Sequence, residues 1–74
     1  MLTGEKAFLP FHQLTGIEIR IVELICEGCS NGDIAIQLGL SKLTARNYVN
    51  RILHKTGFKN RVELAVKFTH HRKQ

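Results

Sequence analysis

Apolar side chains recur every three or four residues in four stretches of this chain, which is the periodicity of amphipathic helices. A residue suited to cap a helix precedes each stretch, and a glycine follows each of the first three. No stretch alternates between apolar and polar residues as a half-buried strand does. The pattern therefore predicts an all-α domain of four helices.

The predicted helices begin at side chains that accept a hydrogen bond from the first turn. Thr15 and Glu18 match the capping box, in which each side chain bonds the backbone N–H of the other residue. A glycine at the far end supplies the left-handed residue that commonly ends a helix. The other caps are Ser30 with Asp33, Ser41, and Asn60 with Glu63; the terminating glycines are Gly28, Gly39 and Gly57.

Only Gly39, Leu40 and Ser41 join the second and third predicted helices, a length typical of a helix-turn-helix motif. Ala35 is small enough to let the third helix cross the second closely. In such motifs the later helix enters the major groove of DNA. We therefore expect the third helix, about residues 42–56, to read DNA.

In the N-terminal half of this third helix, the outward side chains are suited to contact base edges. Arg46 has the donors to bond guanine O6 and N7, and Asn47 or Asn50 can read adenine. An outward Leu43 can contact a thymine methyl group. The predicted base-reading residues are Lys42, Leu43, Arg46, Asn47 and Asn50.

Polar and basic positions around this face are expected to hold phosphates, which position a protein without specifying sequence. Free amides at the starts of the second and third helices add donors for phosphate oxygens. The predicted phosphate contacts are Ser30, Asn31, Ser41, Thr44, Arg51, His54, Lys55, Lys59 and Arg61.

Charge is segregated along the chain, whose formal net charge is +5. Residues 1–33 hold two cations and five carboxylates, whereas 34–62 holds six lysines and arginines and no acidic residue. A positive face attracts a polyanion. On a helix-turn-helix pattern, this segregation favours double-stranded DNA over the alternative of an ordinary solvated basic face.

The fourth helix is apolar on more than one side. Leu64 and Phe68 share a face that can pack on the first helix, while other apolar positions lie on a second face. A second apolar face in so small a domain predicts a homodimer with two-fold symmetry, which would match two DNA half-sites. The predicted interface is Val62, Ala65, Val66 and Thr69.

Residues 1–13 form a predicted N-terminal arm ahead of a helix-turn-helix domain at 14–74. Pro10 disfavours a long helix there, and Phe8, Leu9 and Phe11 are apolar. We expect the arm to pack on the domain; the alternative is that it is the remainder of a linker. No apolar run is long enough for a signal peptide or membrane span, so a cytoplasmic location is expected.

Cys26 and Cys29 form a C-x-x-C pair, but a zinc site needs two more ligands, and no histidines pair at a matching spacing except the adjacent His70 and His71. We expect a core-facing Cys26, an incidental Cys29 in a loop, and no metal or cofactor; a metal-gated or redox-gated regulator is the alternative. The chain also lacks a glycine-rich phosphate loop and paired inward carboxylates, and capping explains its serines, so no enzymatic activity or small-molecule substrate is expected.

Residues 14–66 contain a series of short motifs: Leu14-Thr15 with Glu18; Leu24-Ile25 and Glu27-Gly28; Ser30-Asn31 with Ile34-Ala35 and Leu38; Leu40-Ser41 and Thr44; Ile52-Leu53 with Lys55 and Gly57; and Asn60-Arg61-Val62-Glu63. In these motifs the chain resembles the DNA-binding domain of LuxR/GerE-type (FixJ-type) regulators. Its length resembles the stand-alone GerE-like members, and the alternative is a piece of a larger regulator. The resemblance implies a four-helix domain with its third helix in the major groove and dimerisation through the fourth. It places base reading at Arg46, Asn47 and Asn50, and phosphate contacts at Asn31, Thr44, Arg51 and Lys55.

Several positions depart from the pattern of the family that the chain resembles. Gly16-Ile17 replaces a usual Pro-Arg, and Gly32 replaces a basic residue, which should weaken phosphate binding. Ala45 replaces Val and Thr56 replaces Leu, which should lower stability; Tyr48 replaces a usual His.

The sequence thus predicts a sequence-specific DNA-binding transcription regulator. The alternative is a protein-interaction adaptor that docks on RNA polymerase or on another regulator through its fourth helix.

Overall fold

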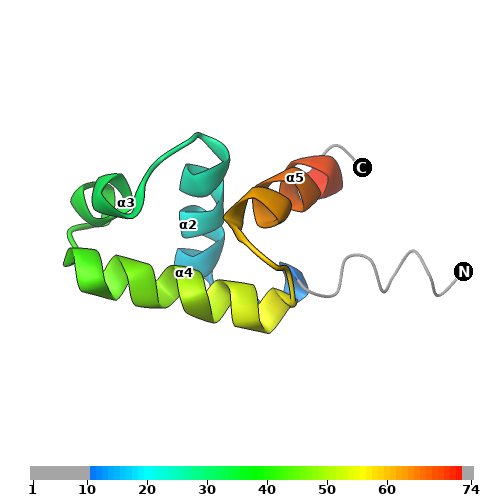
Figure 1. Ribbon diagram of the computed structural model, residues 1–74, viewed down its shortest axis with the longest axis horizontal. Helices are drawn as coiled ribbons and strands as arrows, with labels where there is room; N and C mark the ends of the chain where they lie inside the picture. The colour runs from blue at the N-terminus through cyan, green and yellow to red at the C-terminus, as the bar shows by residue number, and fades with distance from the viewer. Residues whose placement is uncertain (1–10, 73–74) are drawn as a thin grey trace, which may run out of the picture.

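The computed structural model describes residues 11–72, and every regular element in that range is helical. A helical turn at Phe11 and His12 precedes the four helices. These are α2 (Gly16–Cys26), α3 (Asn31–Leu38), α4 (Lys42–Thr56) and α5 (Arg61–Arg72) (Figure 1). The prediction of an all-α domain with four helices is confirmed.

The helices begin where the capping pattern predicted. The Thr15 hydroxyl accepts the Glu18 N–H at 3.3 Å, and the Glu18 carboxylate accepts the Thr15 N–H at 2.8 Å. Ser30 and Asp33 form a second capping box at 3.0 and 3.1 Å. These reciprocal bonds satisfy backbone donors that have no partner inside the helix.

The start of α5 differs in one detail from that pattern. The Asn60 side chain accepts the Glu63 N–H at 2.9 Å, as a cap should. The Glu63 carboxylate, however, accepts the N–H of Lys59 at 2.7 Å and not that of Asn60. At the start of α5, the Glu63 carboxylate therefore bonds the residue before the cap and not the cap itself.

Gly28, Gly39 and Gly57 each adopt a left-handed backbone, with φ of 90°, 68° and 79°. After α2, Gly28 N–H donates to the Ile25 carbonyl and Cys29 N–H donates to the Leu24 carbonyl. This is the Schellman pattern, which ends a helix by using its last free carbonyl groups. The predicted helix stops are confirmed.

The α4 helix is the longest and runs along one side of the molecule, with α2 and α3 packed on it and α5 beside α2 (Figure 1). The small side chains of Ala35 and Ala45 are buried in the core that α3 and α4 share. The largest fully buried apolar side chains come from all four helices: Ile21, Val22, Leu24, Ile34, Ile52 and Leu64. One core therefore sets the angle between α3 and α4.

Phe11, from the predicted arm, is buried in this core. Its ring lies 5.1 Å from that of Phe68 and 5.8 Å from that of Phe58, measured between centroids. The other apolar residues assigned to the arm, Phe8 and Leu9, lie outside the described residues. At Phe11, the chain ahead of α2 packs on the domain.

Thr56 is buried, but its hydroxyl is not left without a partner. It donates to the Ile52 carbonyl at 2.8 Å, one turn back along α4. The desolvation cost that a buried hydroxyl would otherwise carry is thereby largely offset. None of the described helices is long and apolar enough to cross a membrane.

Candidate nucleic-acid interface

The N-terminal half of α4 presents a mostly polar face to solvent, and the charged side chains on this face are basic. The Ser41 hydroxyl accepts the Thr44 N–H at 3.0 Å and caps the helix. No acidic residue lies in the first turn of α4. The positive end of the helix dipole is therefore not neutralised there, which suits a phosphate group.

The five predicted base-reading residues all lie exposed on this half of α4. Within residues 11–72, no hydrogen bond or ion pair occupies the side chains of Arg46, Asn47 or Asn50. Leu43 is one of the few large apolar side chains that the fold leaves exposed. The donors that a base edge needs are free, as base reading requires.

A surface hollow lies between the start of α3 and the first turns of α4. Asn31 lines it on the α3 side, and Lys42, Leu43 and Arg46 line it on the α4 side. The fold therefore places Asn31, a predicted phosphate contact, next to the predicted base-reading residues. Folding brings Asn31 next to these residues although it is more than ten positions from the nearest of them in the sequence.

Apart from the half-buried Asn31, the predicted phosphate contacts fall into two groups. The first group is exposed and consists of Ser30, Ser41, Thr44, Arg51, His54 and Lys59. The Arg51 guanidinium lies 5.5 Å from the centroid of the Tyr48 ring, which restricts its position along α4. The second group consists of Lys55 and Arg61, whose cationic ends are bonded inside the protein.

Lys55 bonds Glu18. Its ammonium lies 2.8 and 3.0 Å from the two carboxylate oxygens, and Glu18 is only 2% exposed. Burial alone would raise the pKa of Glu18, but bonds from Lys55 and the Thr15 N–H outweigh it and hold the pKa below its usual range. Lys55 therefore ties the end of α4 to the start of α2, a role that the sequence analysis did not identify.

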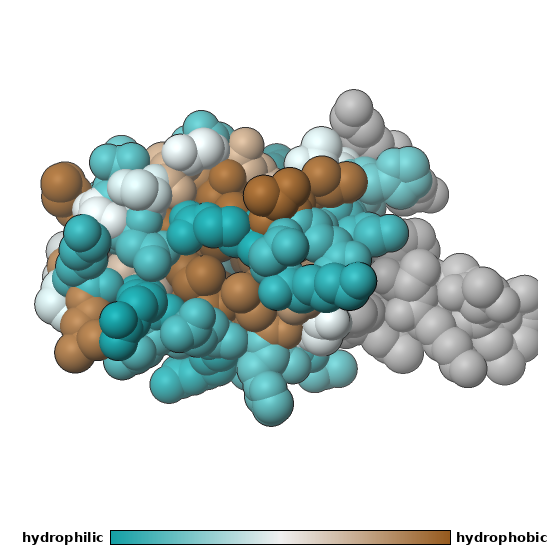
Figure 2. All heavy atoms as spheres, in the orientation of Figure 1, coloured by the Kyte–Doolittle hydropathy of each residue, from teal (hydrophilic) through white to brown (hydrophobic). Residues whose placement is uncertain are grey.

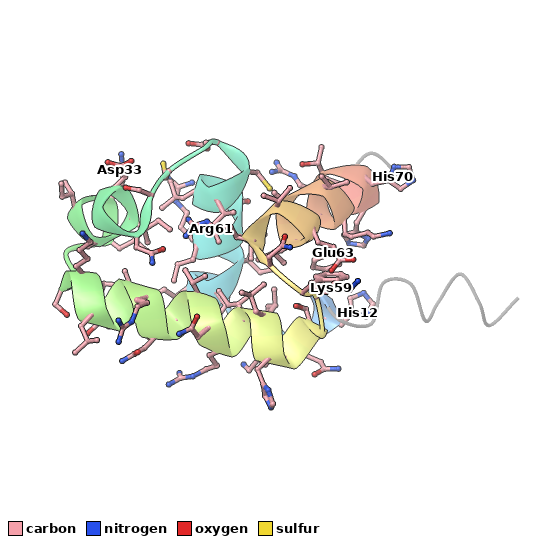
Figure 3. The ribbon with its side chains drawn as sticks, viewed as in Figure 1. His12, Asp33, Lys59, Arg61, Glu63 and His70 are labelled. Atoms are coloured by element: carbon pink, nitrogen blue, oxygen red, sulfur yellow. The ribbon has the colours of Figure 1, made fainter. Side chains whose placement is uncertain are left out.

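Arg61 bonds the segment that leads into α3. Its Nη1 donates to the Asn31 Oδ1 at 2.7 Å, and its Nη2 donates to the Cys29 carbonyl at 2.8 Å. In Figure 3 the side chain extends from the first turn of α5 toward this segment. The guanidinium thus bonds both residues that flank Ser30, the N-cap of α3.

The face of α5 opposite Leu64 and Phe68 is apolar and uncovered. Val62 is 68% exposed and Val66 is 60% exposed, and Figure 2 shows apolar atoms gathered over this part of α5. Ala65 and Val66 line two shallow hollows on this face, one shared with Thr69 and the other with Val62. The predicted dimer residues therefore lie together on one surface.

Cys26 is half-buried against α5. Its Sγ donates to the Ala65 carbonyl and accepts from the Thr69 hydroxyl, both at 3.7 Å. Both cysteines are free thiols packed against the core. Within the described part of the chain, no group of three or more histidine, cysteine or acidic residues is arranged to hold a metal.

A family model described as "Bacterial regulatory proteins, luxR family" matches residues 12–68, which include all four helix starts and the helix-turn-helix. The chain belongs to this family. The match confirms the resemblance that the motifs indicated, and it extends to the aromatic core residue Phe68.

Curated relatives of this luxR-family chain are regulators. It is 36% identical over 59 residues to "Transcriptional regulatory protein DesR" of Bacillus subtilis (strain 168), covering 80% of this chain and 30% of that protein. It is 39% identical over 57 residues to "DNA-binding transcriptional activator DevR/DosR" of Mycobacterium tuberculosis (strain ATCC 25618 / H37Rv), covering 77% and 26%. The chain thus spans less than a third of the length of these relatives. No solved structure matches it.

Proposed function

We propose that this luxR-family chain is a sequence-specific double-stranded DNA-binding transcription regulator that inserts α4 into the major groove. The observation that carries the proposal is the exposed set Arg46, Asn47 and Asn50 on the later helix of a helix-turn-helix, whose side chains have no partner among residues 11–72. The names of the relatives, one of them a DNA-binding activator, support it. No acidic side chain from 34–62 opposes a polyanion at this face.

In this arrangement, base edges are read by the first half of α4. Arg46 bonds a guanine through O6 and N7, Asn47 or Asn50 bonds an adenine, and Leu43 contacts a thymine methyl group. Lys42 lies at the rim, where it reaches either a base or the adjacent phosphate. Specificity therefore rests on a few side chains within three turns of one helix.

Phosphates are held on both flanks of this face. The starts of α3 and α4 contribute backbone amides and the polar side chains of Ser30, Asn31, Ser41 and Thr44. Further along, Arg51, His54 and Lys59 supply donors and charge. These contacts orient the protein on the duplex and make binding dependent on salt.

Two copies associate through α5 in this proposal. The exposed Val62 and Val66, with Ala65 and Thr69, form an apolar surface that a second copy buries. A symmetric dimer matches an operator with two related half-sites. The same surface also fits the alternative, docking on RNA polymerase or another regulator.

Selection of bound duplexes from a random library tests the proposal. We expect a motif of two related half-sites about one helical turn apart. A single half-site would support base reading without the dimer. Recovery of no motif, with binding that depends only on salt, would contradict sequence-specific reading and favour the adaptor.

A further inference from the structure

We propose that Arg61 is a positioning residue that orients Asn31 toward a DNA phosphate and is not itself a phosphate ligand. The proposal rests on the proposed function, because it concerns the α3 side of that interface. It assigns a different role to Arg61 from the one expected for a basic residue in the 34–62 stretch.

The hydrogen bond from Arg61 Nη1 determines the orientation of the Asn31 side-chain amide. A guanidinium has only donors, so the Asn31 atom that lies 2.7 Å from Nη1 must be the carbonyl oxygen Oδ1. The amide group is planar, and therefore its NH2 group points away from Arg61. No side chain or backbone group in residues 11–72 accepts a hydrogen bond from that NH2 group.

The second bond of Arg61 fixes the backbone that carries Asn31. Nη2 donates to the Cys29 carbonyl at 2.8 Å, so one guanidinium spans residues 29–31. Ser30, between the two contacts, is held by its capping box with Asp33. The side chain and the backbone of Asn31 are thus both fixed before a ligand binds, which reduces the entropy lost on binding.

The location of Asn31 gives this orientation a use. It lines the hollow with Lys42, Leu43 and Arg46, at the edge of the predicted base-reading face. A phosphate there meets the Asn31 NH2 group together with the free amides in the first turn of α3. Arg61 donates to two acceptors of its own chain and therefore acts on that phosphate only through Asn31.

Arg61→Lys and Arg61→Met test the proposal on the duplex selected by the wild-type protein, far below the unfolding temperature of every variant. Lysine keeps the charge but cannot bridge two acceptors as the guanidinium fork does. We expect both variants to lose about tenfold in affinity, the size of one hydrogen bond to a charged group. Arg61→Met should leave the salt dependence of binding within the error of the wild-type slope, because Asn31 is uncharged.

The double variant of Arg61→Met and Asn31→Ala tests whether Arg61 affects DNA binding through Asn31. We expect Asn31→Ala to weaken binding about as much as Arg61→Met, and the double variant to be less than about twofold weaker than either one, since coupled residues are non-additive. Lys67→Met removes a cation from α5 outside the interface and should leave affinity and slope unchanged.

Three outcomes would overturn the inference. One is that Arg61→Lys binds like wild type while Arg61→Met lowers the salt slope by about 0.9 per protomer, which indicates a direct phosphate contact. Another is that the two losses add in the double variant. The third is that Arg61→Met or Asn31→Ala binds like wild type. Failure of the proposed function looks different, because then the wild-type protein itself prefers no duplex.

Discussion

Glu18 is a buried carboxylate that joins the start of α2 to the end of α4. It caps α2 through the Thr15 N–H and, with its other contacts, bonds the Lys55 ammonium at the end of α4. A buried charge is tolerated when it is paired and hydrogen-bonded, but the loss of one partner leaves the other charge in an apolar setting. Removing only one member of the Glu18–Lys55 pair should therefore cost more stability than replacing both members by apolar residues.

Lys55→Met is expected to lower the free energy of unfolding by about 2–3 kcal/mol, because it leaves the Glu18 carboxylate buried without its cation. Urea denaturation measures the change. Lys59→Met, at an exposed neighbour, is the control and should stay within about 0.5 kcal/mol of wild type. A similar small change for Lys55→Met would show that the ion pair contributes little.

Acid should destabilise the fold in part through Glu18. Its pKa is lowered in the folded protein from an ordinary value of about 4.5. The folded state thus holds this proton less tightly than the unfolded state, so the stabilisation is present above that value and is lost as pH falls through the folded pKa. Stability measured between pH 7 and pH 3 should fall less steeply at the acidic end for Glu18→Gln. Identical slopes for the two proteins would argue against this assignment.

The turn between α3 and α4 depends on the backbone of one glycine. Gly39 has φ of 68°, where an added Cβ is strained, whereas Gly32 lies inside α3 and a Cβ there would meet only Ser30 Oγ at 3.7 Å. Gly39→Ala should lower the free energy of unfolding by about 1–2 kcal/mol. Gly32→Ala should raise it by about 0.5 kcal/mol, since it removes backbone freedom from the unfolded chain. Thermal unfolding of both variants compares them, and a loss of stability in both would contradict the backbone explanation.

Arg46→Ala tests the proposal that the exposed face of α4 reads bases. We expect it to cost about 1–3 kcal/mol of binding on the selected duplex and to relax the preference at the base pair that Arg46 contacts. Arg20→Ala removes an exposed guanidinium from α2 and serves as the control. Repeating the duplex selection with each variant gives the measurement; an unchanged motif for Arg46→Ala would mean that this side chain does not read a base.

At the scale of the molecule, the described part of the chain carries an apolar surface on α5 that the monomer leaves open. Val66→Asp places a charge in the centre of that surface and should weaken self-association by about tenfold or more. Ile36→Asp is a matched control, because Ile36 is 82% exposed but lies on α3. Sedimentation equilibrium over a range of concentrations reports the change. A dimer unaffected by Val66→Asp, or a wild-type protein that stays monomeric at high concentration, would contradict the proposed interface.

The sequence by itself determined the features that depend on neighbouring residues. The periodicity of apolar positions, the caps at Thr15, Ser30, Ser41 and Asn60, and the left-handed glycines act over three to five residues, so a linear pattern contains them. The exposed face of α4 was predictable for the same reason, because helical spacing places Arg46 and Asn50 outside the buried stripe of Ala45 and Val49.

Only the tertiary structure decided which cations are available. Lys55 and Glu18 are 37 residues apart, and Arg61 and Asn31 are 30 residues apart. Both pairs exist because packing of the helices brings these side chains together, and no local pattern specifies that distance. In sequence, Lys55 and Arg61 look like the other basic residues of the 34–62 stretch. Folding places each of these two cations beside acceptors of its own chain. Because a carboxylate or carbonyl group at short range bonds a cation strongly, both side chains are already engaged in the folded protein.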